Sequence, residues 1–436
     1  MNNIVVGDFA RKKIAEGIEL AYNKVKSNYG SKNIELNGYL TIFDLEAQDK
    51  FVNLGVKIIK EEAKEIHYKF GDGTTLLIIL IHSLLNDLYW NADNLQSDLK
   101  IITDYLKEIS MPLLMPRDIF NIINGTSKGN KEIVNYLLEA IDMVGINGTI
   151  AIDENDNDIT EVMISDGIQV KSKLLQCSTN NTLNDVKILI TTKKITSSAQ
   201  ILQILQQTIQ TNNPLLIIAD GIEGEALSTI KINNIHKTIN VCAVKLQQCD
   251  VEKIVLATNA TMIVDSAPLK ALGNAQRVII DKDNVIFFGC KKKYKSNRLA
   301  IIKVGSNDEI EKKSLIKQYQ KSLRALTSAL SYGVVPAIST SAFFASKKLN
   351  LKSNLLKTAI THPLKILIEN SQLDYTTITN EIMKKELPYG FNSHTKTIDN
   401  LICNGGIESY ATICDILQRS VHTALRLASS GVLITN

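Results

Sequence analysis

The hydrophobic pattern changes twice along this chain, and that change constrains the fold more than any single motif. Apolar residues recur at helical spacing in residues 8–30 and 51–67, and a nearly continuous apolar stretch follows Gly73. Residues 166–289 instead alternate short β-prone runs with helical segments, as α/β domains do. Helical spacing returns after Lys303. This order predicts an α/β domain inserted into a helical part that both ends of the chain form.

The same periodicity predicts the individual elements. Helices are expected at residues 8–30, 51–67, 74–88, 95–109, 130–144, 198–210, 223–234, 309–332, 340–347, 355–370, 378–385 and 407–428. Strands are expected at residues 186–191, 215–219, 239–245, 261–264, 278–280 and 284–288. Two prolines between Met111 and Arg117 break the helical pattern and mark a candidate hinge.

Composition narrows the class of protein. A chain of 436 residues exceeds the roughly 100–200 residues of one domain, so two to four domains are expected. Its 44% hydrophobic and 22% charged residues are typical of globular proteins. The net charge of +4 is too diffuse for a nucleic-acid-binding surface. The first residues do not form a signal peptide, and no apolar run could cross about 30 Å of hydrocarbon. We therefore expect neither nucleic acid nor a membrane as a partner.

Cysteines and histidines give little support to a metal or nucleophile site. The six cysteines are scattered without a CxxC pair, so reduced thiols are expected rather than a zinc site or a disulfide framework. An unrelated α/β enzyme would need a catalytic group in the middle of the chain. His236, Cys242 and Cys249 have no suitable partners nearby in the sequence for that role.

The sharpest local motif is Gly71-Asp72-Gly73-Thr74-Thr75, directly before the apolar helix. The two glycines allow a ligand to approach the backbone, free amides at a helix start attract phosphate oxygens, and the threonines add donors. Asp72 is then the candidate ligand of the magnesium ion that accompanies phosphates. The alternative is an ordinary Asp-Gly turn with Thr74 as a helix cap. It is not a Walker loop, because no Gly-Lys-Ser/Thr follows.

Several further segments fall in a familiar order. Residues 49–55 precede the phosphate-binding motif, residues 214–227 read PLLIIADGIEGEAL, and Tyr389-Gly390-Phe391-Asn392 and residues 431–435 follow near the end. Together with residues 71–75 they resemble group I chaperonins, the GroEL family, over nearly the whole chain. The 214–227 segment is similar to an apical strand and helix that are characteristic of this group.

The resemblance implies a multidomain α and α/β fold with three domains. The equatorial ATP-binding domain would be residues 1–108 and 332–436, the intermediate hinge domain 109–165 and 298–331, and the apical polypeptide-binding domain 166–297. It also implies ATP and Mg²⁺ as cofactors, unfolded polypeptides as clients, and a small co-chaperonin lid. Members form seven-membered rings, and a mixed ring is an alternative. The expected location is a bacterial cytoplasm or the lumen of an organelle derived from a bacterium.

The family's nucleotide site maps onto specific positions. Gly30 and Lys32 fall in the first phosphate-contacting turn, and Asp72, Gly73, Thr74 and Thr75 match the phosphate loop. Asn392 matches the adenine-side contact. Glu408 stands near the family's ribose-binding Asp and is one methylene longer.

Three departures affect hydrolysis. Lys321 occupies the position where the family places an Asp that orients the attacking water, and an ammonium cannot accept a proton from that water. The family's second water-orienting Asp lies in a stem loop that is shortened here, and Asp44 is a candidate substitute for it. The glycine-rich turn of the family is replaced by residues 336–339, whose side chains would crowd a nucleotide. Two functions follow: an ATP-dependent chaperonin subunit that assists folding, or a degenerate relative that binds nucleotide or polypeptide with little or no hydrolysis.

The resemblance also places an apolar polypeptide-binding stripe on two helices of the α/β part. Its positions are Leu202, Leu205, Ile209, Leu227 and Ile232. An exposed apolar groove suits the recognition of unfolded chains because it selects hydrophobicity rather than sequence. Alternatively, these are ordinary core positions of amphipathic helices. Lys231 interrupts the stripe, which predicts weaker or altered binding of clients.

Overall fold

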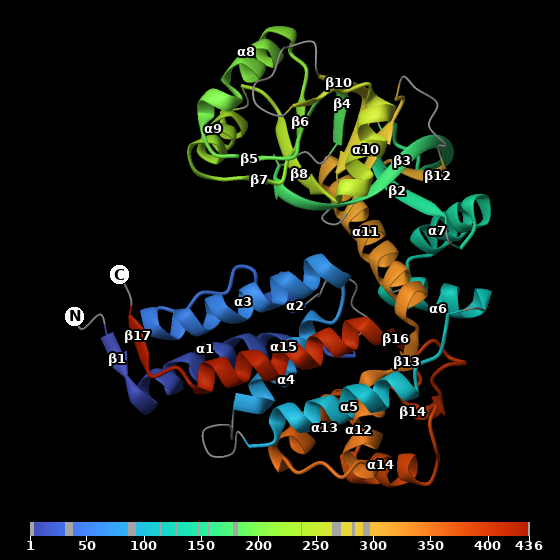
Figure 1. Ribbon diagram of the computed structural model, residues 1–436. Coiled ribbons are helices and arrows are strands. Elements are labelled where there is room, and N and C mark those ends of the chain that lie inside the picture. Colours follow the sequence, from blue (N-terminus) through green and yellow to red (C-terminus); the bar gives the residue numbers. More distant parts are fainter. Residues whose placement is uncertain are drawn as a thin grey trace. The chain divides into compact units, whose positions relative to one another are not determined.

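A computed structural model describes residues 4–30, 38–85, 93–113, 115–127, 129–146, 148–155, 157–177, 182–236, 238–263, 272–280, 284–290 and 297–434. The chain forms two compact units. The first combines Met1–Leu138 with Lys313–Asn436, and the second is Glu139–Lys312. The boundaries fall inside helices α7 (Lys131–Val144) and α11 (Glu309–Tyr332). Each unit is coloured by sequence in Figure 1.

The first unit is a helical bundle. Its main helices are α1 (Gly7–Val25), α3 (Lys50–Phe70), α4 (Thr74–Leu85), α5 (Leu95–Glu108), α12 (Ile338–Lys348), α13 (Asn354–Asn370) and α15 (Tyr410–Ala428). Helix α4 contacts α1, α3, α13 and α15, so it is the central helix of the bundle (Figure 1). Nine of its 12 residues are buried, which explains why its sequence is apolar on every side.

Helix α3 is amphipathic, and its start is fixed by polar contacts. The Asp49 carboxylate accepts hydrogen bonds from the amides of Phe51 and Val52, as an N-cap does, and pairs with Lys13 of α1 at 2.9 Å. Its buried face includes Val56 and Ile59. Capping and burial together set where the helix that precedes the 71–75 loop begins.

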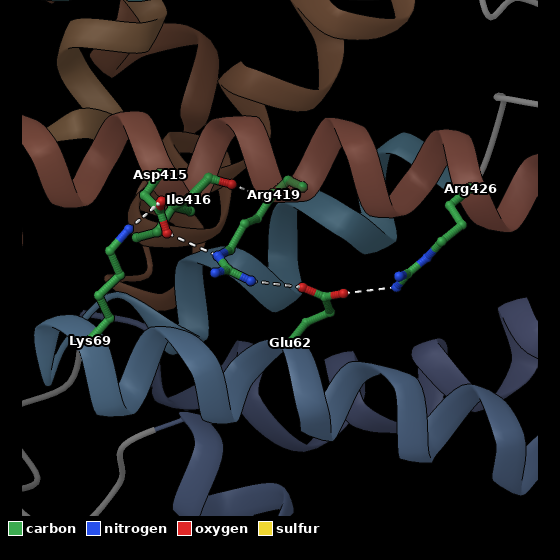
Figure 2. A network of polar contacts seen from close by, with 7 residues as sticks. Glu62, Lys69, Asp415, Ile416, Arg419 and Arg426 are labelled. Carbon is green, nitrogen blue, oxygen red and sulfur yellow. Dashed lines mark hydrogen bonds and ion pairs between the residues drawn. The ribbon is translucent and has the colours of Figure 1, made fainter. Parts of the chain in front are cut away.

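A network of charged side chains joins α3 to α15 (Figure 2). Glu62 of α3 accepts from Arg426 at 2.8 Å and lies 3.5 Å from the Arg419 guanidinium. Asp415 pairs with Arg419 at 2.9 Å and with Lys69 at 2.7 Å. The network therefore runs along the polar side of the contact between these two helices, opposite their buried apolar faces.

Short elements complete the first unit. These are η1 (Lys26–Asn28), α2 (Gly38–Ile42), α6 (Pro116–Thr126) and α14 (Tyr375–Met383). Three two-stranded sheets join β1 (Ile4–Val6) to β17 (Val432–Ile434), β13 (Val334–Pro336) to β16 (Ile407–Ser409), and β14 (Tyr389–Asn392) to β15 (Thr397–Asn400), all antiparallel. The first of these sheets brings the two ends of the described chain together (Figure 1).

The second unit is built on a nine-stranded mixed sheet within the described residues. Its strands are β2 (Thr149–Glu154), β3 (Glu161–Gln176), β4 (Thr182–Thr191), β6 (Leu215–Ile218), β8 (Val241–Leu246), β9 (Met262–Ile263), β10 (Gly273–Ile280), β11 (Asn284–Phe288) and β12 (Asn297–Val304). The order is β11-β10-β4-β6-β8-β3-β12-β2, with β9 beside β4 and a further pairing of β11 with β3. Strands β4, β6 and β8 are parallel. Strands β5 (Lys194–Ile195) and β7 (Gly221–Ile222) form a separate pair.

Both faces of the parallel strands are covered. Alternate residues of β6 belong to different cores: Leu216 and Ile218 to one, Leu215 and Ile217 to the other. Helix α10 (Gln248–Thr258) covers the first face. Helices α8 (Leu202–Thr211), preceded by η3 (Ser198–Gln200), and α9 (Gly224–Ile235) cover the second. The continuous apolar run at 215–218 reflects this double burial.

Several sequence-based expectations need correction. The helix expected at 407–428 begins at Tyr410, because Ile407, Glu408 and Ser409 pair with β13 as a strand. The segment that follows the proline break is helical, since Pro116 occupies the first turn of α6, where its missing N–H costs nothing. Helix α4 is described as far as Leu85, and residues 86–88, where the helix was expected to continue, lie outside the described residues. The pattern also missed α10 and strands β2, β3 and β12.

The expectation that all cysteines are reduced is wrong for one pair. Cys177 and Cys242 form a disulfide across 65 residues of sequence. Cys177 follows β3 and Cys242 lies in β8, and these strands are neighbours in the sheet. Cys290, Cys403 and Cys414 are free thiols. No helix in the described ranges is long and apolar enough to span a bilayer.

Candidate functional site

The 71–75 loop is shaped by two glycines with left-handed backbone conformations. Gly71 (φ 76°) ends α3, and its amide donates to the His67 carbonyl at 2.9 Å. Gly73 (φ 84°) immediately precedes α4. A Cβ at Gly73 would clash with Cδ1 of buried Ile416. The glycines therefore allow the turn between α3 and α4 and the close packing of the start of α4 on α15.

A cavity of about 220 Å³ opens at this loop, entirely within the first unit. Residues 72–75 line it together with Tyr29 and Gly30, which follow α1, and Glu408 and Ser409 of β16. Lys321 and Ala325 of α11 border it as well. Its volume is below the roughly 300–1,000 Å³ of typical ligand pockets, so the space suits a group of phosphate size better than a whole nucleotide.

Lys321 lies directly beside the loop. Its Nζ is 3.6 Å from Oδ1 of Asp72, and its side chain is 14% exposed whereas that of Asp72 is 54% exposed. A Cβ on Gly71 would lie only 2.9 Å from Cα of Lys321, so the glycine allows the backbones to approach. One turn along α11, the Arg324 guanidinium donates to the Tyr68 carbonyl at 3.1 Å. Helix α11 is thus held against the loop at Gly71 and against the last turn of α3 at Tyr68.

Two of the titratable groups that border the cavity, Glu408 and Tyr29, have shifted pKa values. The Glu408 carboxylate accepts a hydrogen bond from the Ile338 amide at 2.9 Å, at the start of α12. Burial raises the pKa of Glu408 to about 7, against the lowering effect of that hydrogen bond. Burial also raises the pKa of Tyr29, and the negative charges of Glu408 and Asp72 act in the same direction. Near neutral pH, Glu408 can therefore exist with or without its proton.

The sequence-predicted nucleotide residues are partly brought together. Gly30, residues 72–75 and Glu408 line one cavity. Asn392 is not among its lining residues; its amide donates to Asp399 at 3.1 Å within the β14–β15 hairpin. Lys32 lies outside the described residues. Asp44 is exposed in the turn after α2 and does not line the cavity.

Other features of the site were not found from sequence. Gly38 packs so closely that a Cβ there would lie 2.7 Å from the Thr75 amide nitrogen. The Tyr39 amide donates to the Thr74 hydroxyl at 3.2 Å, which ties α2 to the loop. Residues 336–339 were expected to crowd a nucleotide, but they do not line the cavity. The Gly38-Tyr39 pair had offered a signal, since an isolated glycine often marks a close backbone approach.

The expected polypeptide-binding positions divide into two groups in the second unit. Leu202 and Ile209 of α8 and Ile232 of α9 are exposed, at 47%, 40% and 55% respectively. Leu205 is 2% exposed and belongs to the core beneath α8, and partly buried Leu227 packs against that core. For Leu205 the alternative interpretation, an ordinary core position, fits the structure better. The exposed stripe is therefore narrower than expected.

Comparison with known proteins gives the family. The model of the TCP-1/cpn60 chaperonin family matches residues 22–429, so the chain belongs to this family. It is 27% identical to "Chaperonin GroEL" of Mycoplasmoides gallisepticum, with 98% of this chain and 96% of that protein covered. It is 25% identical to "Chaperonin GroEL 3" of Protochlamydia amoebophila, covering 94% and 90%.

Solved structures support the same fold. The chaperonin gp146 of bacteriophage EL 2 (Pseudomonas aeruginosa), crystallised in the presence of ATP-BeFx, matches with a TM-score of 0.71 at 17% identity. The alignment covers 99% of both chains. The chain is thus a divergent GroEL-family chaperonin subunit that assists protein folding. The family uses ATP with Mg²⁺, acts on polypeptide substrates and forms oligomeric rings, and its bacterial GroEL members are typically cytoplasmic.

A magnesium ion on Asp72 conflicts with the charge beside it. Mg²⁺ binds oxygen ligands at about 2.0–2.1 Å, so an ion on Oδ1 would lie within about 6 Å of the Lys321 ammonium. The repulsion between charges of +2 and +1 at that distance is about 1.4 kcal/mol in water and about 5.5 kcal/mol at an effective dielectric constant of 20. In the described ranges, no cluster of three or more His, Cys, Asp or Glu side chains could hold a metal ion, so an ion on Asp72 would take its other ligands from phosphate oxygens and water. These residues, as arranged, do not fit a divalent ion at Asp72.

Proposed function

We propose that this chaperonin subunit binds ATP with its phosphates in the cavity at the start of α4. The observation that carries the proposal is that Gly73, Thr74 and Thr75 face one cavity at the N-terminus of a helix of 12 residues. Amide groups at a helix start and the helix dipole both favour phosphate oxygens. Gly30, which also lines the cavity, would contact the phosphates, and Glu408 would lie on the ribose side. Lys32 as a phosphate contact and Asn392 as an adenine contact stay predictions.

We further propose that hydrolysis is slow. The family's water-orienting Asp is replaced by Lys321, whose protonated ammonium has no lone pair to accept a proton from water. Asp44, the candidate replacement, is exposed in a turn and not among the lining residues. Removal of a positioned general base typically costs about 10²- to 10⁴-fold in rate. This favours the interpretation of a nucleotide-binding subunit with weak turnover.

The finer family properties are proposals as well. Exposed Leu202, Ile209 and Ile232 would bind non-native polypeptide, because an accessible apolar surface is what such clients recognise. A seven-membered ring, alone or mixed with other subunits, and a small co-chaperonin lid follow the family pattern. The expected compartment is a bacterial cytoplasm or an organelle of bacterial origin.

Nucleotide titration combined with steady-state hydrolysis tests both parts of the proposal. Purified protein, with its particle mass measured, should bind ATP saturably in excess Mg²⁺ but hydrolyse it at least about 100-fold more slowly than an active GroEL-family chaperonin assayed in parallel. Thr75→Val should weaken binding about fivefold through the lost hydroxyl, whereas Thr358→Val, on the exposed side of α13, should not. Absence of binding would refute the nucleotide site. Turnover within a few-fold of the reference would refute slow hydrolysis.

A further inference from the structure

The cavity carries a fixed positive charge where a metal ion would otherwise be expected. Lys321 Nζ lies 3.6 Å from Oδ1 of Asp72, and the lysine is the more buried partner. Its backbone packs on Gly71, where a Cβ would approach Cγ of Lys321 to 2.8 Å. The stem of this lysine is therefore confined between α11 and the loop.

The charged side chains that border the cavity show why the positive charge of Lys321 matters for binding an anion. Among the described lining residues, the carboxyl and amine side chains are Asp72, Glu408 and Lys321. A triphosphate entering this cavity would be repelled by Asp72, and by Glu408 when it is ionised, unless a cation compensated them. Lys321 already neutralises Asp72 and still has three N–H donors to share between a carboxylate and a phosphate oxygen.

We propose that a nucleoside triphosphate binds this cavity without a divalent cation, and that Lys321 supplies the compensating positive charge. This inference rests on the proposed nucleotide site and concerns what that site requires. The ammonium bridges Asp72 and the phosphates, and the amides at the start of α4 complete the anion-binding surface. The substitution that removes the water-orienting carboxylate thereby also removes the need for the metal.

Nucleotide binding with and without metal tests the inference. ATP would be titrated calorimetrically into the intact protein in excess Mg²⁺ and again in excess EDTA. The wild-type dissociation constant should differ by less than about threefold between the two conditions. Lys321→Met keeps the apolar stem and removes the charge, and it should weaken binding in EDTA by at least about tenfold. Lys317→Met, an exposed lysine one turn earlier on α11, is the matched control and should leave binding unchanged in both conditions.

The outcomes separate the two proposals. If the wild type binds ATP in Mg²⁺ but loses it in EDTA, the nucleotide site stands and metal independence is refuted. If Lys321→Met binds as well as the wild type in EDTA, the lysine is not the compensating charge, and the inference fails. If ATP binds in neither condition, the nucleotide site itself fails. Lys321→Asp adds a positive test, because it should make binding depend on Mg²⁺.

Discussion

Replacing Gly71 by alanine should disturb both the stability of the first unit and the position of Lys321. Gly71 has a φ of +76°, a region that costs other L-residues about 1–2 kcal/mol. The new Cβ would lie 2.9 Å from Cα and 3.1 Å from the carbonyl oxygen of Lys321. Because these are backbone atoms, relief requires α11 to move. Overpacking of this kind costs about 1–3 kcal/mol more, so the free energy of unfolding should fall by about 2–5 kcal/mol.

Gly7→Ala provides the matched control. Gly7 also has a positive φ, of +62°, but nothing lies within 4 Å of its ideal Cβ. It should therefore show the backbone cost alone, about 1–2 kcal/mol. Urea unfolding followed by far-UV circular dichroism measures both variants, and their midpoints can be compared if the slopes agree. ATP titration in EDTA adds a second readout, in which Gly71→Ala should bind more weakly than Gly7→Ala.

The comparison has a clear negative outcome. If the two variants shift the midpoint equally, the close packing of α11 on the loop does not exist in solution. If Gly71→Ala is the less stable variant but binds ATP in EDTA as the wild type does, the packing is real and Lys321 is not held by it.

Two further predictions concern charge. Glu62→Gln should cost about 1 kcal/mol of unfolding free energy at low salt because it removes the centre of the α3–α15 network, whereas Arg426→Gln, at a 64% exposed side chain, should cost less than about 0.5 kcal/mol. Equal costs, or costs that persist at high salt, would contradict the network. Burial lowers the pKa of His82 to about 4, below its ordinary value of 6.5, so the unfolded chain binds a proton first as the pH falls. The associated stability is complete above about pH 6.5 and is lost between pH 6.5 and 4. After allowance for the partial exposure of His82, the loss of unfolding free energy is about 1–2 kcal/mol. His82→Phe keeps the stacking on Tyr22 and should lose less unfolding free energy over this pH range in urea titrations. An unchanged pH dependence in this variant would refute the assignment to His82.

Local sequence patterns predicted most of the helices. Some strands and the disulfide depend instead on which distant segments pair with each other. The helix expected at 309–332 has those bounds in the structure, because apolar spacing alone decides a long helix. Residues 407–409 fit a helical pattern equally well, and they form a strand because β13, more than 70 residues earlier, offers a free edge. The Cys177–Cys242 pair likewise depends on which strands become neighbours, and spacing in the sequence cannot show that.

The candidate site also has one part that is local in sequence and another that depends on contacts between distant residues. The 71–75 loop is local in sequence, and its glycines and threonines were sufficient to predict it. The approach of Lys321 to Asp72 joins residues 249 positions apart, so periodicity could not predict the ion pair. The resemblance to chaperonins identified Lys321 as a substitution, and its partner became evident from the packing on Gly71. The buried environment of Glu408 arises in turn from the β13–β16 pairing.

The split construction of the first unit has a consequence for synthesis on the ribosome. Helix α4 is almost wholly apolar, yet its partner α13 begins about 270 residues later. At a translation rate of roughly 5–20 residues per second, about 15–55 s pass between the synthesis of α4 and that of α13. The inserted unit has its own cores and can fold during this interval. Helices α1 and α3 precede α4 and can cover part of it, but the nascent chain leaves the apolar faces that pack on α13 and α15 uncovered for much of its synthesis, and it is itself a substrate for the kind of protection that chaperones give.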